Sequence, residues 1–299
     1  MIPFPAVGVT RPNFLVLTPI CVSLGLASAL LSGHEIDWPI FFVAMLGALM
    51  AHASVNALNE YADFQSGLDF KTERTPFSGG SGTLVIEPHL APLALGIGLA
   101  SLAITIGCGL YLFLHAGWGL IPIGVTGVVI IVLYTGVINR HRLLVLVAPG
   151  LGFGPLMVVG THYALTGSYS PMAFVLSLIP FFLVNNLLLL NQVPDIEADR
   201  SVGRDNYAIA WQPSRSAWIY GGFALLAYLV VALCVIAGYL PLAALLGLLT
   251  AGLAYQVFTA VRGYRGEVSS LVPYLGKNVA VTLATPLLVF IGIILNDFL

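Results

Sequence analysis

Long apolar stretches run through most of this chain, and charged or Gly/Pro-rich breaks separate each stretch from the next. A helix that crosses a lipid bilayer needs roughly 20 mostly apolar residues, and about nine stretches meet that requirement. The pattern therefore predicts an all-α membrane protein with about nine transmembrane helices in one bundle. We expect these helices at residues 14–32, 38–62, 91–114, 117–137, 143–166, 171–191, 216–237, 239–261 and 273–296.

The composition supports a protein embedded in a bilayer. Hydrophobic residues make up 59% of the chain and charged residues only 8%, and the mean hydropathy is +0.98. That is far more apolar side chain than one soluble core can use. The predicted helices leave two loops of any size, at about 65–90 and 192–215, so we expect residues 1–299 to form a single transmembrane domain.

The positions of the basic residues predict the orientation in the membrane. Alternate loops carry Arg11, Lys71, Arg74, Arg140, Arg142, Arg200, Arg204, Arg215, Arg262 and Arg265. Cytoplasmic loops of membrane proteins carry an excess of Lys and Arg. We therefore expect an integral protein of the cell or inner membrane, with its N-terminus and both larger loops in the cytoplasm. After nine spans, the C-terminus lies on the opposite side.

Two acidic clusters stand out because the remainder of the chain has almost no charge. The first contains Asn59, Asp63 and Asp69 in the run NEYADFQSGLD, and the second contains Asn191, Asp195 and Asp199 in the run NQVPDIEAD. Removing a carboxylate from water costs several kcal/mol, so acids at the mouths of apolar segments usually face a cavity and meet a cation or a partner. The two clusters predict one metal site built from two halves.

The spacing within each cluster brings its oxygen atoms together. Asn59 and Asp63 are four residues apart and share one face of a helix, and Gly67 permits a turn that returns Asp69 toward them. The second cluster forms a stripe at i, i+4 and i+8, which Pro194 interrupts with a predicted kink just before the next residue. Oxygen ligands suit Mg²⁺, which keeps several waters and joins a few carboxylates to substrate phosphates.

Basic residues accompany both clusters. Lys71 and Arg74 follow the first, and Arg200 and Arg204 follow the second. Mg²⁺ held beside arginines suits a pyrophosphate, because the metal bridges its oxygens while arginine supplies directed hydrogen bonds. Mutual salt bridging between the two loops is the competing explanation. The stretch TPFSGGSGTL at 75–84, which contains Ser78, is either an anion-binding loop or a flexible connector.

The two clusters resemble the paired motifs of the UbiA-type intramembrane prenyltransferase superfamily. Its first motif is Asn-x-x-x-Asp with a further Asp four or six residues on, and its second is Asn-x-x-x-Asp-x-x-x-Asp. The longer spacing found here is similar to that of the menaquinone branch, the 1,4-dihydroxy-2-naphthoate prenyltransferases. The run GLGFGPLMVVGTHYALTG at 150–167 and the dipeptide at Arg11 and Pro12 also resemble that branch. The chain differs where the branch commonly has Gly-Lys-x-Thr, because residues 203–206 are GRDN.

This resemblance covers about residues 11–215 and implies both an architecture and an activity. The architecture is nine helices around a central cavity open to the cytoplasmic side and to lipid. The activity is Mg²⁺-dependent transfer of an isoprenoid chain from a prenyl diphosphate to an aromatic, quinone-precursor-like acceptor, with release of pyrophosphate. Its partners are the two substrates and the lipid bilayer, and no nucleic acid is expected.

The chemistry of the residues and the resemblance together predict roles for individual residues. The metal ligands are Asp63, Asp69, Asp195 and Asp199, and two of them, Asp63 and Asp195, are also expected to be catalytic. Substrate contacts are assigned to Asn59, Asn191, Arg11, Lys71, Arg74, Arg204, Ser78 and His162.

In the expected reaction, the allylic C–O bond breaks as the pyrophosphate leaves, and the aromatic ring attacks the resulting prenyl cation. Aromatic rings stabilise such a cation and shield it from water. Tyr61, Tyr134 and Tyr163 are candidates, with packing at the membrane interface as the alternative for each. His162 is a candidate to accept the phenolic proton of the acceptor, or else it bonds a neighbouring helix.

Two other classes of protein share some of these features. A UbiA-like terpene cyclase uses the same ionisation but has no separate acceptor. A cation channel or transporter also places acids on helix ends, although its acids are expected deeper in the spans and without bases beside them. The products of turnover separate these alternatives.

Overall fold

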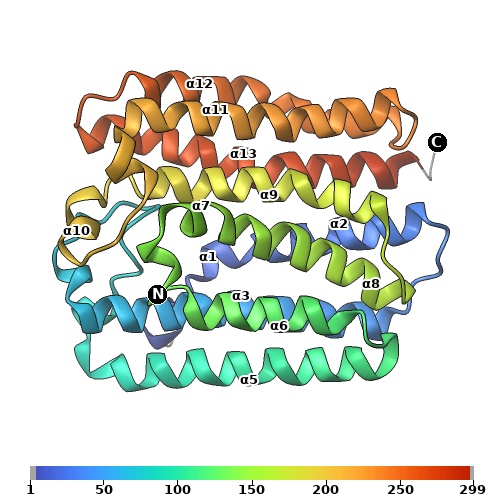
Figure 1. Cartoon of the computed structure of the whole chain (residues 1–299), viewed down its shortest axis with the longest axis horizontal. Coiled ribbons are helices and arrows are strands. Elements are labelled where there is room, and N and C mark those ends of the chain that lie inside the picture. The colour runs from blue at the N-terminus through green and yellow to red at the C-terminus, as the bar shows by residue number, and fades with distance from the viewer. Residues whose placement is uncertain (1–4, 297–299) are drawn as a thin grey trace.

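The computed structural model describes residues 5–296, and all regular secondary structure in that part of the chain is helical. The long helices lie side by side with roughly parallel axes (Figure 1). They are α3 (Trp38–Ser66), α5 (Ala91–Ala116), α9 (Pro171–Asn191), α11 (Tyr207–Ile236) and α13 (Val268–Leu295). The predicted all-helical class is therefore confirmed.

Shorter elements complete the bundle. Those within it are α1 (Pro12–Leu15), α2 (Leu17–Leu31), α6 (Leu120–Leu133), α7 (Arg142–Leu151), the π-helix η5 (Gly152–Val159), α8 (Gly160–Thr166), η6 (Leu242–Thr250) and α12 (Ala251–Arg262). Those in the connections are η1 (Pro5–Thr10), η2 (Leu68–Phe70), α4 (Thr83–Ile86), η3 (Pro88–Leu90), η4 (Ile138–Arg140) and α10 (Ile196–Ser201).

Seven helical segments within residues 5–296 are long and apolar enough to cross a membrane. An eighth span results if Ala6–Leu15 and Leu17–Leu31, which meet at a bend of 43°, are taken together. The bend has a local cause, because Pro19 has no N–H to donate to the carbonyl of Leu15 and crowds that oxygen. The stretch expected at 117–137 forms α6, which has only 14 residues. Nine spans therefore remain a prediction.

Local sequence signals explain both ends of α3 and the end of α9. At the start of α3, Asp37 Oδ1 accepts a hydrogen bond from the backbone N–H of Ile40 at 3.1 Å. The helix ends at Gly67, whose φ of 76° lies in the left-handed region that glycine adopts at little cost. Helix α9 ends at Asn191, and Pro194 lies in the break before α10. The turn predicted at Gly67 and the break predicted at Pro194 are both present.

The segment α7–η5–α8 packs unusually close to α9. A Cβ added to Gly150 would lie 2.2 Å from the carbonyl oxygen of Phe181, and one added to Gly154 would lie 2.5 Å from that of Ser177. The backbone N–H of Gly150 also donates to Asn185 Oδ1 at 2.6 Å. The glycines of the GLGFGP run therefore allow two helix backbones to approach. Helices α3, α5 and α6 lie on the other side of this segment (Figure 1).

Candidate active site

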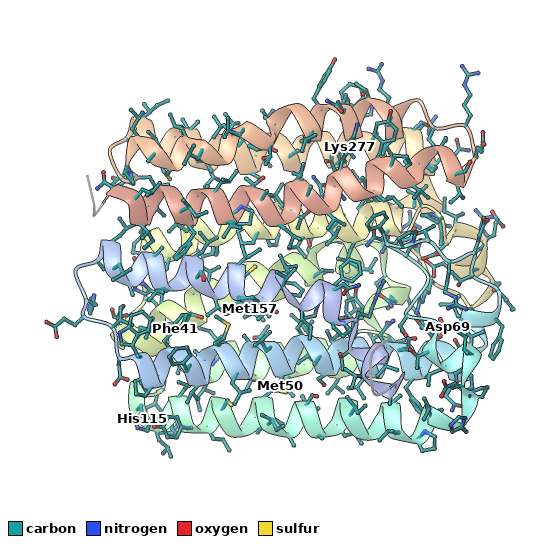
Figure 2. All side chains as sticks on the ribbon, turned by 180° about the vertical axis from the view of Figure 1, so that it is seen from behind. Phe41, Met50, Asp69, His115, Met157 and Lys277 are labelled. Atoms are coloured by element: carbon teal, nitrogen blue, oxygen red, sulfur yellow. The ribbon has the colours of Figure 1, made fainter. Side chains whose placement is uncertain are left out.

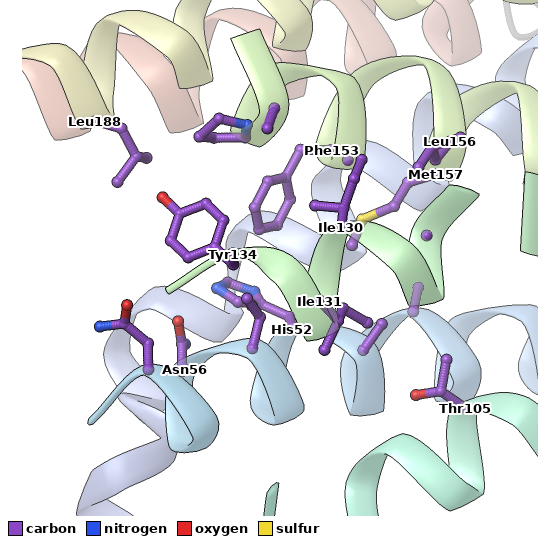
Figure 3. Close-up of a pocket in the computed structure, with 18 of the residues that line it drawn as sticks. His52, Asn56, Thr105, Ile130, Ile131, Tyr134, Phe153, Leu156, Met157 and Leu188 are labelled. Atoms are coloured by element: carbon purple, nitrogen blue, oxygen red, sulfur yellow. The ribbon is translucent and has the colours of Figure 1, made fainter. Parts of the chain in front are cut away.

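A cavity of about 680 Å³ lies among α1, α3, α5, α6, η5 and α9 (Figure 3). One end of it carries the polar side chains of both acidic clusters, and we call this the acidic end. Figure 2 places Asp69 at this end of the bundle, with Phe41 and His115 at the other end. Toward that far end the cavity is lined by apolar residues such as Leu112, Phe113 and Leu120.

The first cluster occupies the last turns of α3 and the short η2 helix. Asn59 Nδ2 donates to Asp63 Oδ2 at 2.8 Å, and Asn59 Oδ1 accepts from the hydroxyl of Thr135 at 3.0 Å. Asp69 is buried, and its Oδ2 has no hydrogen-bond partner among the described residues. All three side chains line the cavity, as predicted from their spacing.

The second cluster follows α9 and continues into α10. Asp199 is 3% exposed, and its Oδ2 accepts from Asn206 Nδ2 at 3.1 Å. Asn191 and Asp195 each have a buried Oδ1 with no hydrogen-bond partner within residues 5–296. These side chains also line the cavity, so two motifs that are far apart in the sequence face one space.

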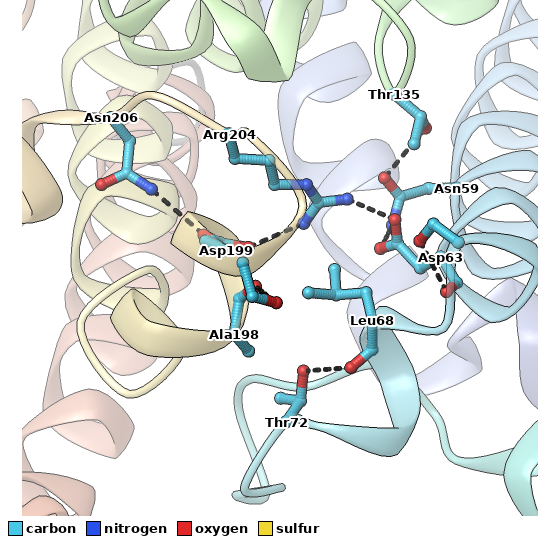
Figure 4. Close-up of polar contacts among 11 residues, drawn as sticks. Asn59, Asp63, Leu68, Thr72, Thr135, Ala198, Asp199, Arg204 and Asn206 are labelled. Carbon is cyan, nitrogen blue, oxygen red and sulfur yellow. Dashed lines mark hydrogen bonds and ion pairs between the residues drawn. The ribbon is translucent and has the colours of Figure 1, made fainter.

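Arg204 connects the two clusters directly. Its Nη1 donates to Asp199 Oδ1 at 3.0 Å, and its Nη2 forms an ion pair with Asp63 Oδ1 (Figure 4). The salt bridging that the sequence left open as an alternative is therefore present for this arginine. Arg204 also lines the cavity, where its guanidinium lies beside the oxygens expected to meet a substrate.

Burial changes the proton affinity of the acids outside the spans. Burial and the neighbouring Asp63 and Glu60 carboxylates raise the pKa of Asp69 to about 7. Burial and Asp199 raise the pKa of Asp195 to about 7, although Arg204 opposes the shift. A cation beside these groups would favour their ionised forms.

The donor atoms at the acidic end fit Mg²⁺. The buried, unpartnered oxygens of Asp69, Asn191 and Asp195 are hard ligands of the kind this ion prefers. No three His, Cys, Asp or Glu side chains in the described part of the chain lie close enough together to hold a metal ion by themselves. These donor atoms therefore suit an ion that completes its coordination shell with water and phosphate oxygens, as Mg²⁺ usually does.

The glycine-rich stretch is packed against this end of the cavity. Ser78, Gly79 and Gly80 line it, and a Cβ added to Gly80 would lie 3.2 Å from Glu60 Oε2. Glu60 Oε2 accepts from the backbone N–H of Ser81 at 2.9 Å, and Oε1 accepts from its hydroxyl. The sequence did not single out Glu60, although an acid inside the first motif run was a signal for it.

Other predicted site residues divide into two groups. Arg11 and Tyr134 line the cavity, and Arg11 holds a left-handed backbone with φ of 53° while its Nη2 donates to the Phe77 carbonyl at 3.5 Å. Lys71 and Arg74 are exposed and do not line it. The ammonium of Lys71 donates to Ser201 Oγ at 3.3 Å, which links the two loops.

The structure does not bring Tyr163 or His162 to the acidic end. Both are buried in α8 and neither lines the cavity. Figure 1 shows α8 and α10 at opposite ends of the bundle, because α7, η5 and α8 run on as one rod away from the acids. Tyr163 packs with Ile40 and Leu120 instead. Tyr61 packs with Val9 and Ala57, also outside the cavity lining.

Comparison with known proteins identifies the class. The model of the UbiA prenyltransferase family matches residues 16–274, so the chain belongs to this family. It is a prenyltransferase, and the resemblance inferred from the paired motifs is confirmed.

The chain is also similar to individual proteins of known name. The chain is 29% identical to the 1,4-dihydroxy-2-naphthoate octaprenyltransferase of Bacillus subtilis (strain 168) over 236 residues, which cover 77% of this chain and 73% of that protein. It is 29% identical to the UbiA prenyltransferase domain-containing protein 1 of Xenopus tropicalis, over 95% of this chain and 80% of the relative.

Solved structures share the fold. The apo structure of a UbiA homolog from Aeropyrum pernix K1 superposes with a TM-score of 0.68 at 18% identity, covering 96% of this chain and 98% of the other. A UbiA homolog from Archaeoglobus fulgidus bound to DMAPP and Mg²⁺ gives a TM-score of 0.59 at 16% identity, covering 96% of this chain and 99% of that one.

Proposed function

We propose that this protein transfers an isoprenoid chain from a prenyl diphosphate to an aromatic, quinone-precursor-like acceptor, in a Mg²⁺-dependent reaction within the membrane. The observation that carries the proposal is a cavity with acids and unpartnered oxygens at one end and apolar walls at the other. Such a cavity matches a donor whose head is anionic and whose tail is hydrocarbon. The naphthoate octaprenyltransferase relative supports an aromatic acceptor.

The acidic end would hold the diphosphate head of the donor. Asp69, Asn191 and Asp195 would hold Mg²⁺ with Asp63 and Asp199, and the bound ion would neutralise charge on the leaving diphosphate. Arg204 is placed to donate directed hydrogen bonds to the same oxygens once it moves from a carboxylate. Arg11 adds a second guanidinium to the cavity lining.

The apolar part of the cavity would hold the isoprenoid chain. Asp63 and Ala44 both line it, and they are nineteen residues apart on the same helix. At about 1.5 Å per helical residue, this separation is roughly 28 Å, which suits a long chain. The walls exclude water from a carbocation, and Tyr134 lies at the cavity surface where an aromatic face can stabilise it.

The two rival activities make different use of this cavity. A terpene cyclase would need no place for an aromatic acceptor. A cation transporter would need polar groups along its path, whereas the far half of this cavity is lined by Leu112, Phe113 and Leu120. The apolar far half therefore favours a prenyl chain over a conducted ion.

One assay decides among the three activities. The purified protein in lipid nanodiscs is given prenyl diphosphates of several lengths, a panel of hydroxylated aromatic acids, and either Mg²⁺ or EDTA. We expect a prenylated aromatic and pyrophosphate, with Mg²⁺ only. A cyclic hydrocarbon would identify a cyclase, and ion flux without turnover would identify a transporter.

A further inference from the structure

His52 is a buried histidine in the wall of the cavity. It lies on α3, is 6% exposed, and its Nδ1 is 2.9 Å from the hydroxyl oxygen of Thr18. Its ring packs edge to face against Phe153, with the ring centroids 4.7 Å apart. These two contacts fix the position and the plane of the imidazole. The hydrogen bond of Nδ1 is the only one that the ring makes among the described residues, so Nε2 is free.

His52 continues a polar stripe that begins at the acidic end. Asp63, Asn59, Asn56 and His52 recur at helical spacing on one face of α3, and all four line the cavity. Figure 3 shows His52, Asn56, Tyr134 and Phe153 around the same space. His52 and Asp63 are eleven residues apart, or roughly 16 Å along the helix at about 1.5 Å per residue. The space between these two side chains is therefore long enough for the diphosphate of the donor and, next to it, the aromatic ring of the acceptor.

Two other polar groups beyond the acidic end, Asn56 and Thr105, are already engaged. Asn56 Nδ2 donates to the carbonyl of Thr10 at 2.9 Å. The hydroxyl of Thr105 donates to the carbonyls of Ser101 at 2.9 Å and Gly47 at 3.3 Å. The Nε2 lone pair of His52, by contrast, has no partner among the described residues and can accept a hydrogen bond from a ring hydroxyl. A buried imidazole is favoured in its neutral form, in which this lone pair is available.

We propose that His52 binds the ring hydroxyl of the aromatic acceptor and takes its proton. This inference rests on the proposed function. Nδ1–H donates to Thr18 Oγ1, which leaves the Nε2 lone pair to accept the hydroxyl proton. The C1–O bond breaks, its electron pair leaves with pyrophosphate, and a ring carbon forms a bond to C1 of the prenyl chain. The positive charge that this places on the ring makes the hydroxyl a strong acid, so its proton moves to Nε2 and the ring becomes a dienone. The attacked ring carbon then loses its hydrogen as a proton to water and the imidazolium returns its proton to the ring oxygen, which restores the aromatic hydroxyl.

The test compares a hydroxylated acceptor with its O-methyl analogue, which has no proton to give. For His52→Gln, we expect kcat/KM with the hydroxylated acceptor to fall about 10²-fold, whereas the O-methyl analogue should change less than about threefold, because only the first acceptor uses the base. The KM for the prenyl diphosphate should stay unchanged. Thr18→Val should give a smaller loss of the same kind, since the imidazole remains but loses its anchor.

Thr250→Val is the matched control, because it removes a buried hydroxyl that bonds Tyr228 and Thr285 away from the cavity. It should leave the ratio of the two acceptors unchanged. If His52→Gln loses activity equally with both acceptors, whether from misfolding or another cause, the inference is overturned. No loss with either acceptor would also overturn it. If the wild-type protein prenylates no aromatic compound at all, the proposed function itself has failed.

Discussion

The balance of charge at the acidic end depends on one side chain, that of Arg204. Its side chain is 16% exposed, and those of its two partners, Asp63 and Asp199, are 10% and 5% exposed. A planar guanidinium reaches both carboxylates at once, whereas an ammonium has one nitrogen. Removing one partner from a buried pair leaves an uncompensated charge, which typically costs about 3–5 kcal/mol. The surrounding acids therefore need this arginine whenever no other cation is present.

Replacing Arg204 by lysine tests its role toward the substrate. We expect Arg204→Lys to raise the KM for the prenyl diphosphate about tenfold or more and to leave the KM for the acceptor unchanged, because directed hydrogen bonds to phosphate are lost. Arg200→Lys is the control, since Arg200 forms an exposed pair with Glu197, and such pairs contribute roughly 0–1 kcal/mol. Unchanged kinetics in Arg204→Lys would remove this residue from the donor site.

The acids themselves allow a second test. Asp63→Ala and Asp195→Ala should each lower kcat at least about 10²-fold at saturating Mg²⁺, because each change removes a proposed ligand of the Mg²⁺ that would stabilise the leaving pyrophosphate. The control is Glu197→Ala, an exposed acid on α10 that does not line the cavity. Near-normal turnover in either aspartate variant would disprove a site shared by the two motifs.

The raised pKa values predict how Mg²⁺ dependence changes with pH. Because the pKa values of Asp69 and Asp195 lie at about 7, these groups gain protons as the pH falls from 8 to 6. Protons then compete with the metal, so the Mg²⁺ concentration for half-maximal activity should rise over this range. Titrations at several pH values measure it. A concentration that stays constant or falls would show that these carboxylates do not bind the metal.

At the scale of elements, the glycine-rich segment is held in place by α3. Glu60 accepts two hydrogen bonds from Ser81, and Gly79, Gly80 and Gly82 all have positive φ values that glycine tolerates. The segment thereby forms one wall of the acidic end instead of a free connector. The ordered conformation of this segment therefore depends on the Glu60 carboxylate, which holds Ser81 in place.

This dependence predicts a local effect of Glu60→Gln. The neutral amide loses charge-assisted hydrogen bonding to Ser81, so amide hydrogen exchange at 78–82 should accelerate about tenfold or more. Exchange in α9 should stay unchanged. Glu73→Gln is the control, because Glu73 is exposed in the same loop. Equal exchange in the wild-type protein and Glu60→Gln would show that this contact does not hold the segment.

The sequence predicts individual helices and their ends better than it predicts the contacts between helices. Gly67 and Pro194 set helix ends through their own backbone chemistry, so both were predictable. The assignment of His162 used its place in a matched run, but α8 lies at the far end of the bundle from the acids. The pairing of Arg204 with Asp63 joins residues 141 positions apart, which no local pattern specifies.

At the scale of the whole molecule, charge is unevenly distributed between the two ends of the bundle. Lys71 and Arg204 lie in loops at the acidic end, and Arg200 lies in the short helix α10, where Lys71 contacts Ser201. The turn at 33–37 at the other end carries acids and no Lys or Arg. By the positive-inside rule, we propose that the acidic end and the N-terminus face the cytoplasm and the C-terminus faces the opposite side. A soluble diphosphate head would then enter from the cytoplasm.

Cysteine labelling tests this orientation. In a background with Cys21, Cys108 and Cys234 replaced by alanine, single changes Glu73→Cys and Glu197→Cys mark the acidic end, and Glu35→Cys marks the other end. All three positions are exposed. An impermeant thiol reagent added to intact cells should label only Glu35→Cys, because the bilayer shields cytoplasmic loops. After permeabilisation all three should react, which controls for local access. Labelling of Glu73→Cys and Glu197→Cys from outside, with Glu35→Cys protected, would show that the acidic end faces outward.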